Sequence, residues 1–447
     1  MAQKIKTPSA EDLMSMWNAS GLKQKIIFTF LMIAVWRLGV QLPLFGINHE
    51  IFTRTMAGQN NLIGFLDMFT GGALGKVSIL ALGIGPFITS SIIVQLISVV
   101  IPSMEKLQKE EGEAGRRKLA QYTRVFTVVL AIFQAFIFML FLHSRPEVIV
   151  TSINPIVFYT SSICVLTAGA VLVMWISELI TERGIGNGGS LIIFCGILAG
   201  IPIYTTNTLK LVQPNTGMQM NLLLLLVIFF IAMIFIVIMQ EAVRKVIIVN
   251  PKRQIGNKVY GGMNSFIPFK LNPGGVMPII FAIAILLFPS TILSIVGQAN
   301  FKSESAKNFI MMLTQYMSPN GILYYAIYIG LIIALTFFYA SIMPNMQPKD
   351  IADNLKKYGS SIPGIKPGRP TAEALDKILS KTTFIGAMGL GIIALVPSFA
   401  SYATHIETLQ GIGATSLIIM VGVALDLINQ VKTHLLARNY ESFLKDM

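Results

Sequence analysis

Long apolar stretches, most of them about the length needed to cross a lipid bilayer, alternate with polar connections along the chain. A transmembrane helix needs about 20 predominantly apolar residues. The pattern predicts ten spans: Ile26–Leu44, Val77–Ile101, Val125–Leu142, Ile156–Ile176, Gly189–Tyr204, Leu222–Met239, Gly274–Val296, Ile322–Met343, Thr382–Ala400 and Ala414–Ile428. The fifth and tenth are short and contain small and polar residues, which favours positions inside the protein over positions facing lipid.

One apolar stretch departs from this pattern because it is too short to cross a bilayer and contains paired glycines. Leu62–Leu74 reads LIGFLDMFTGGAL and is followed almost directly by the second span. Irregular backbone at membrane depth is tolerated only where protein buries it or where it lines a watery cavity. The stretch therefore predicts a broken, re-entrant half-helix and a pathway through the membrane.

The composition agrees with a polytopic membrane protein. Hydrophobic residues make up 54% of the chain and charged residues only 12%, whereas soluble domains carry about 25% charged residues. Residues 1–25 are more polar than the spans, and Leu13, Met16 and Trp17 share one helical face. This cytoplasmic N-terminal segment is compatible with an amphipathic helix on the membrane surface or with packing on another protein.

Charge orients the predicted bundle. The chain has 34 Lys and Arg residues and a net charge of +13. Most of these basic residues fall on one side of the ten spans, so the positive-inside rule places both termini in the cytoplasm. Two loops on that side, residues 241–271 and 344–381, are longer than topology requires. The first alternates apolar and polar residues like a hairpin, and the second ends in a helix-like TAEALDKIL. Such loops are either solvated, lipid-binding basic segments or docking surfaces for a soluble partner.

Candidate chemistry is sparse. The sequence contains no G-x-S-x-G, H-E-x-x-H, P-loop or dinucleotide-binding motif. Its two cysteines, Cys164 and Cys195, lie in apolar runs, and its four histidines are far apart, so we expect no cofactor and no metal site. Arg37, Asp67 and Asp426 are the candidate intramembrane charges. Ion-coupled transporters carry charges near the midplane, so the pattern favours a passive conduit over a secondary transporter or an inert scaffold.

Two long motifs resemble the SecY family, the pore-forming subunits of the protein translocase. They are LALGIGPFITSSIIVQLI at Leu80–Ile97 and WISELITERGIGNGGSLIIF at Trp175–Phe194. FLDMFTGGAL, VNPKRQ, ADNLKKYGSSIPGIKPG and GATSLIIMVGVALDLINQV agree with the family as well, so the resemblance covers essentially the whole chain. It implies an all-α membrane protein with ten transmembrane helices in two pseudo-symmetric halves, residues 26–205 and 206–431, followed by a cytoplasmic tail at 432–447.

The resemblance also implies the function. Members of this family are passive protein-conducting channels of the bacterial cytoplasmic (inner) membrane, not enzymes. They pass polypeptides bearing signal sequences across the membrane and release membrane proteins sideways into lipid. The expected partners are SecE-like and SecG-like small membrane subunits, a SecA-like motor ATPase, the ribosome and membrane lipid.

Carried over to this sequence, the family's apolar pore ring corresponds to six isoleucines: Ile84, Ile88, Ile193, Ile197, Ile280 and Ile419. The first two and the next two are each four residues apart, so each pair shares a helix face. A tight ring of branched alkyl groups blocks ions by dewetting. On the seventh and tenth spans the register is open, because Ile279 and Ile418 are adjacent alternatives.

The plug of the family corresponds to residues 61–75. Its expected members are Phe65, Leu66, Asp67, Met68, Phe69, Gly71 and Gly72, with the glycines as a hinge. Thr89, Ser90 and Ser91 match the polar lateral gate between the second and seventh spans. Small residues at such positions also serve helix–helix packing, and the two roles can coexist.

The partner-binding surface corresponds to basic residues of the two long loops. Arg244, Lys245, Lys252 and Arg253 belong to the first loop, and Lys366 and Arg369 to the second. Relatives commonly have an arginine just before the Pro-Gly of the second loop, where this chain has Lys366. Lysine keeps the charge but lacks the planar fork of arginine, so either Lys366 or Arg369 carries the expected contact with the motor.

Overall fold

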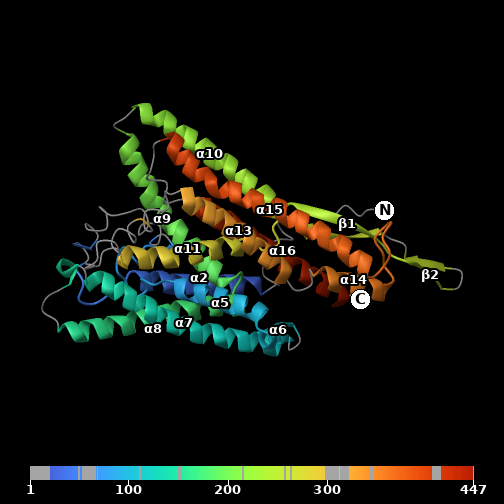
Figure 1. The fold of residues 1–447 in the computed structure, drawn as a ribbon, viewed down its shortest axis with the longest axis horizontal. Helices are drawn as coiled ribbons and strands as arrows, with labels where there is room; N and C mark the ends of the chain where they lie inside the picture. Colours follow the sequence, from blue (N-terminus) through green and yellow to red (C-terminus); the bar gives the residue numbers. More distant parts are fainter. Residues whose placement is uncertain are drawn as a thin grey trace. The chain divides into compact units, whose positions relative to one another are not determined.

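The computed structural model describes most of the chain. The described residues are 21–48, 51–52, 67, 69–109, 112–143, 145–149, 154–213, 216–255, 258–261, 264–296, 312, 322–342, 347–404 and 414–445. Each predicted apolar span overlaps one helix (Figure 1). In chain order these helices are α2 (Leu22–Val40), α5 (Gly85–Val100), α7 (Gly112–His143), α8 (Pro155–Arg183), α9 (Gly188–Val212), α10 (Thr216–Glu241), α11 (Met277–Val296), α13 (Ile322–Ile342), α15 (Arg369–Thr404) and α16 (Ala414–Lys445).

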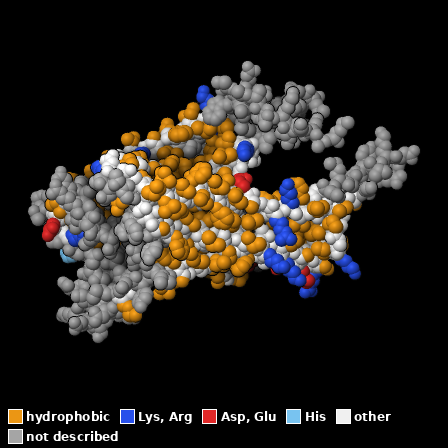
Figure 2. Space-filling model, turned by 90° about the horizontal axis from the view of Figure 1, so that it is seen from above, with side chains coloured by type: hydrophobic (Ala, Val, Ile, Leu, Met, Phe, Trp, Pro, Cys, Tyr) orange, Lys and Arg blue, Asp and Glu red, His pale blue; other side chains and the backbone are white. Residues whose placement is uncertain are grey.

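The described helices differ in their capacity to cross a membrane. Within the described residues, seven helices are long and apolar enough to span one: α7, α8, α9, α10, α13, α15 and α16. α5 is shorter, and so is the stretch Met277–Leu286 of α11. Wide areas of hydrophobic side chains are exposed on the face drawn in Figure 2, as a lipid-facing surface requires.

The predicted start of the second span at Val77 is wrong. Val77–Ile84 forms turns, and helix α5 begins only at Gly85. The backbone explains the difference, because Val77 and Gly83 adopt φ angles of 42° and 55°, which a right-handed helix does not contain. Pro86, within the first two positions of α5, is pre-organised for a helix start. The expected ends also shift at the tenth span, where α16 continues as one helix to Lys445.

Contacts divide the described residues into two compact units. The first unit runs to Tyr204 and resumes at Val423, and the second runs from Thr205 to Gly422. In the first unit, α7 packs against both α5 and α8, and α2 packs against α8. Buried alanines and a glycine permit close approach of these helices: Ala131, Ala135, Ala170 and Gly169.

In the second unit, α15 is the central helix. It packs against α10 and α13, and α13 also packs against α11. Gly389 of α15 admits the side chain of Met239 from α10, because a Cβ on this glycine would lie 2.2 Å from the methionine Cε. Leu390 and Ile393 of α15 are buried beside it.

The two long loops form one small subdomain of the second unit. Strand β1 (Val243–Val249) pairs antiparallel with β4 (Asn264–Lys270), and β2 (Lys252–Ile255) pairs with β3 (Lys258–Gly261). Helix α14 (Pro348–Tyr358) and the first turns of α15 cover one face of the β1–β4 ribbon. The apolar cluster that joins them consists of Val246, Phe269, Ile362, Leu375 and Leu379. The predicted hairpin is confirmed, and the predicted helix at TAEALDKIL is confirmed as the beginning of α15.

Candidate functional site

The centre of the candidate site is the irregular segment that precedes α5 in the first unit. Ala73, Val77 and Leu80 are completely buried there. The backbone of this segment is hydrogen-bonded to the residues that follow α2. The Val77 carbonyl accepts from the Leu44 N–H at 2.9 Å, and the Ile79 N–H donates to the Leu42 carbonyl at 3.0 Å. Non-helical backbone can therefore persist beside apolar helices, because its polar groups have partners.

Asp67 closes the turn at the start of this segment. One carboxylate oxygen of Asp67 accepts a hydrogen bond of 2.6 Å from the Gly75 N–H. The Asp67 carbonyl accepts 2.9 Å hydrogen bonds from the Gly72 N–H and the Thr70 hydroxyl. The intramembrane charge noted in the sequence thus acts locally, as an acceptor for the backbone of the glycine-rich turn.

Gly71 and Gly72 have positive φ angles, a backbone conformation that residues with a Cβ rarely adopt. Their φ angles are 69° and 86°, in the region that glycine adopts without steric cost. A Cβ on Gly71 would lie 2.8 Å from the Trp36 ring and 3.1 Å from the Gly196 Cα of α9. Phe69 is also described, as part of a helical turn, whereas Phe65, Leu66 and Met68 lie outside the described residues. The described part of the predicted plug is thus a tight turn wedged between α2 and α9.

Four of the six predicted ring isoleucines belong to the first unit. Ile84, Ile193 and Ile197 are at most 3% exposed, and Ile88 is half-buried. The Ile84 carbonyl accepts from the Ile88 N–H at 3.1 Å, so this pair does share a helix face at the start of α5. Ile84 Cδ1 also approaches Gly189, the second residue of α9.

The other two ring isoleucines, Ile280 on α11 and Ile419 on α16, belong to the second unit. Both are buried, and so are the adjacent alternatives Ile279 and Ile418. Burial therefore does not choose between the two registers, and the ring positions on these helices stay a prediction.

The motif at Trp175–Phe194 comprises the end of α8, the turn at residues 184–187 and the start of α9. Side chains from three helices hold its backbone: Thr29 Oγ1 accepts from the Ile185 N–H at 3.1 Å, and Gln430 Oε1 accepts from the Gly186 N–H at 2.8 Å. Thr181 Oγ1 accepts from the Gly188 N–H at 2.9 Å. Asn187 then caps the helix through a 3.0 Å hydrogen bond from the Gly189 N–H. This turn sets the position of Ile193 and Ile197, which follow on α9.

Sequence reasoning missed Thr29 and Gln430 as supports of this turn. They lie on α2 and α16, respectively 156 and 244 residues away from their backbone partners. Thr29 stands in an ordinary helical pattern, and Gln430 lies in the family-like stretch GATSLIIMVGVALDLINQV, but neither pattern indicates a backbone partner in the turn before α9.

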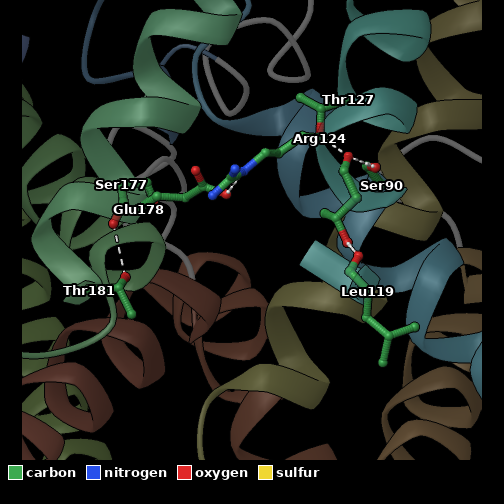
Figure 3. A network of polar contacts seen from close by, with 8 residues as sticks. Ser90, Leu119, Arg124, Thr127, Ser177, Glu178 and Thr181 are labelled. Atoms are coloured by element: carbon green, nitrogen blue, oxygen red, sulfur yellow. Dashed lines mark hydrogen bonds and ion pairs between the residues drawn. The ribbon is translucent and has the colours of Figure 1, made fainter. Parts of the chain in front are cut away.

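The three predicted gate residues on α5 differ in their hydrogen-bond partners. Ser90 is fully buried and donates a 2.7 Å hydrogen bond to the Thr123 carbonyl of α7 (Figure 3). Thr89 donates to the Gly85 carbonyl of its own helix, and Ser91 accepts from Gln95. Ser90 therefore serves helix packing, and the gate role of Thr89, Ser90 and Ser91 stays a prediction.

An ion pair joins α7, which packs against α5, to α8. Arg124 Nε of α7 lies 2.9 Å from Glu178 Oε1 of α8 (Figure 3). The carboxylate is the more buried partner, with 18% of its side chain exposed. Desolvation of this kind strengthens the attraction beyond that of a fully exposed pair. The helices α5, α7 and α8 are thus joined by polar contacts in addition to apolar packing.

The predicted partner-binding residues are placed as follows. Arg244 and Lys245 are exposed on β1, and Lys245 Nζ lies 4.9 Å from the centroid of the Phe266 ring. Lys252 and Arg253 lie on β2. Lys366 is exposed in the turn before α15, and Arg369, the first residue of α15, is exposed as well, with its Nε 3.1 Å from Glu373 Oε1. Because both side chains face outward within one turn, the choice between them stays open.

These features define a class: a multi-pass helical membrane protein with the fold of a protein-conducting channel. A solved structure described as "The structure of a protein conducting channel" is similar with a TM-score of 0.62 at 17% identity, and 92% of each chain is covered. Canine Sec61 in a ribosome–channel complex from the endoplasmic reticulum is similar with a TM-score of 0.56 at 14% identity, covering 92% of each chain. At these identities the likeness concerns the fold.

The family follows from sequence similarity. The family model SecY matches residues 78–428 of this chain. The protein translocase subunit SecY of Synechococcus elongatus is 43% identical over 450 residues, covering 99% of each chain. The chain belongs to the SecY family.

Proposed function

We propose that this chain is the passive protein-conducting channel of a bacterial cytoplasmic membrane, with both termini in the cytoplasm. It passes unfolded secretory polypeptides across the membrane and releases membrane proteins sideways into lipid. The observation that supports this most strongly is the nearly full-length similarity to a protein translocase subunit. The channel catalyses no reaction of its own, and a motor ATPase or the ribosome supplies the driving force.

The apolar ring is the proposed seal. Ile193 and Ile197 are buried on α9, and Ile84 is buried at the end of the irregular segment, with its Cδ1 near Gly189 of α9. Branched alkyl side chains disfavour a continuous column of water and so block ions. They offer a passing chain no strong polar partner, which lets them yield to any sequence. Ile88, Ile280 and Ile419 complete the proposed ring.

The turn at residues 61–75 is the proposed plug, and α5 with its residues Thr89–Ser91 is one side of the proposed lateral gate. Two halves, residues 26–205 and 206–431, form the channel. SecE-like and SecG-like subunits are its membrane partners. The exposed basic residues of the β1–β4 ribbon and of the turn at Lys366 fit a docking surface for the ribosome and a SecA-like motor.

Transport by the purified chain tests the function. Vesicles containing the chain and its small subunits should take up a polypeptide with a signal sequence when a SecA-like motor and ATP are added. Absence of uptake, under conditions in which the Synechococcus relative transports the same polypeptide, would refute the proposal.

A matched pair of substitutions on α9 tests the seal. Ile193→Ser should raise the resting ion conductance of reconstituted channels, because a hydroxyl in the ring favours wetting. Ile203→Ser is the control, since Ile203 lies on the same helix and is 61% exposed. Equal conductance in the two variants would remove Ile193 from the ring.

A further inference from the structure

Arg37 is a charged residue inside the first span to which neither the sequence nor the proposed channel mechanism gives a role. It is half-buried in the last turn of α2. Its Nη1 donates a hydrogen bond to the Gly71 carbonyl of the glycine-rich turn, 34 residues away. Its guanidinium carbon lies 5.8 Å from the centroid of the Trp36 ring, within the range of a cation–π interaction.

The bonded carbonyl lies where three elements converge. A Cβ on Gly71 would be 2.8 Å from Trp36, 3.1 Å from Arg37 Nη1 and 3.1 Å from the Cα of Gly196. Gly196 lies on α9 between the ring residues Ile193 and Ile197. The guanidinium therefore fastens the turn at the point where it touches the helix that carries the proposed seal.

The strength of this contact comes from its charge and its surroundings. A hydrogen bond from an ionised donor is roughly twice as strong as one between neutral groups. Gly71 is buried, so breaking the bond also leaves its carbonyl without this partner, which carries a cost. The hydrogen bond from Gly75 to Asp67 lies within the turn and would move with it, and the carbonyls of Ala73 and Leu74 accept from the next residues of the irregular segment, Ser78 and Val77.

We propose that Arg37 is a positioning residue that latches the turn at Phe69–Gly75 against α2 and α9 while the channel is closed. The turn moves away only when the bond between Arg37 and Gly71 breaks. This inference rests on the proposed role of residues 61–75 as a movable plug. The bond ties α2 to the turn at the point where Gly71 approaches Gly196 of α9, so releasing it removes this tie while leaving the hydrogen bonds within the turn intact.

Accessibility of a buried thiol measures the latch directly. In a background in which Cys164 and Cys195 are replaced by Ser, the Ala73→Cys thiol reports on the turn, because Ala73 is 0% exposed. Ala131→Cys is the matched control, since Ala131 is also 0% exposed but lies in α7. Both thiols are labelled with a membrane-impermeant maleimide in reconstituted vesicles.

Arg37→Met should raise the labelling rate of Ala73→Cys by about tenfold, which is the scale of losing one charged hydrogen bond. Arg37→Lys keeps a charged donor and should raise the rate less. The labelling of Ala131→Cys should stay unchanged in both variants. An unchanged rate at Ala73→Cys, or equal increases at the two reporters, would overturn the latch.

This experiment is separable from the proposed function because labelling requires no transport. If polypeptide uptake fails while the labelling pattern holds, the latch stands and the channel function falls. If uptake succeeds while Arg37→Met leaves the labelling of Ala73→Cys unchanged, the function stands and the latch falls.

Discussion

Thr29→Val should lower the free energy of unfolding and raise the resting ion conductance, because it removes the hydroxyl oxygen that accepts a hydrogen bond from Ile185. The two side chains have nearly the same shape, so packing changes little. Thr29 Oγ1, however, accepts the 3.1 Å hydrogen bond from the N–H of Ile185, and this residue is only 5% exposed. Valine leaves that N–H without its side-chain acceptor. An unsatisfied buried donor costs about 1–3 kcal/mol.

Thr167→Val is the matched control for this prediction. The Thr167 hydroxyl donates to the Ile163 carbonyl of its own helix, which also accepts along the helix, so its loss leaves no orphaned group. We expect Thr167→Val to lower the free energy of unfolding by less than about 0.5 kcal/mol. Titration with SDS in mixed micelles, followed by circular dichroism, gives both free energies.

Resting ion conductance tests whether Thr29 supports the turn before α9 in particular or only the stability of the whole protein. The bond from Thr29 holds the turn before α9, so Thr29→Val should also raise resting ion conductance, whereas Thr167→Val should not. Indistinguishable unfolding free energies for the two variants would refute the reasoning that the Ile185 N–H depends on Thr29.

Three further predictions concern the turn, the helix packing and the docking surface. Gly169→Ala should strongly lower the free energy of unfolding, because the new Cβ would lie 2.0 Å from the Ile79 carbonyl oxygen. Gly330→Ala is the control, since Gly330 has open space around it, and it should leave the free energy unchanged or raise it in the same SDS titration. Asp67→Ala should raise resting conductance more than Asp67→Asn, since the amide keeps an oxygen to accept from the turn's backbone. Lys366→Glu should weaken motor-driven uptake more than ribosome-driven insertion, and equal losses in the two assays would contradict separate roles for the docking residues.

The helices were predictable from the sequence because their signal is local. Long apolar stretches identify a lipid-exposed helix such as α10 almost without context. The broken segment was also predictable as an exception, from its length and paired glycines. Its internal form was not: the late start of α5 depends on the φ angle of Val77 and on hydrogen bonds to the backbone of Leu42 and Leu44, which are remote in sequence.

The candidate site shows the same limit more sharply. The motif before α9 was recognisable as a motif, but two of the side chains that hold its turn, Thr29 and Gln430, come from helices that are remote in sequence. Ser90 illustrates a second limit. From the sequence, a small polar residue on a helix surface fits a lateral gate and a helix–helix contact equally well, and the hydrogen bond to the Thr123 carbonyl, which identifies the contact, is visible only in the structure. Arg37 was visible as a charge, while its partner was a backbone carbonyl that has no sequence signature.

Helix α15 joins the hairpin subdomain to the membrane-spanning part of the second unit as one uninterrupted element. Its stretch Arg369–Val396 begins beside the exposed basic turn, contributes Leu375 and Leu379 to the subdomain's apolar cluster, and then continues as a candidate span. At 1.5 Å per residue this stretch is about 40 Å long. One continuous helix therefore contributes to the subdomain's apolar cluster at its beginning and packs against α10 and α13 along its length, so a change in the ribbon and a change in these two helices share one structural element.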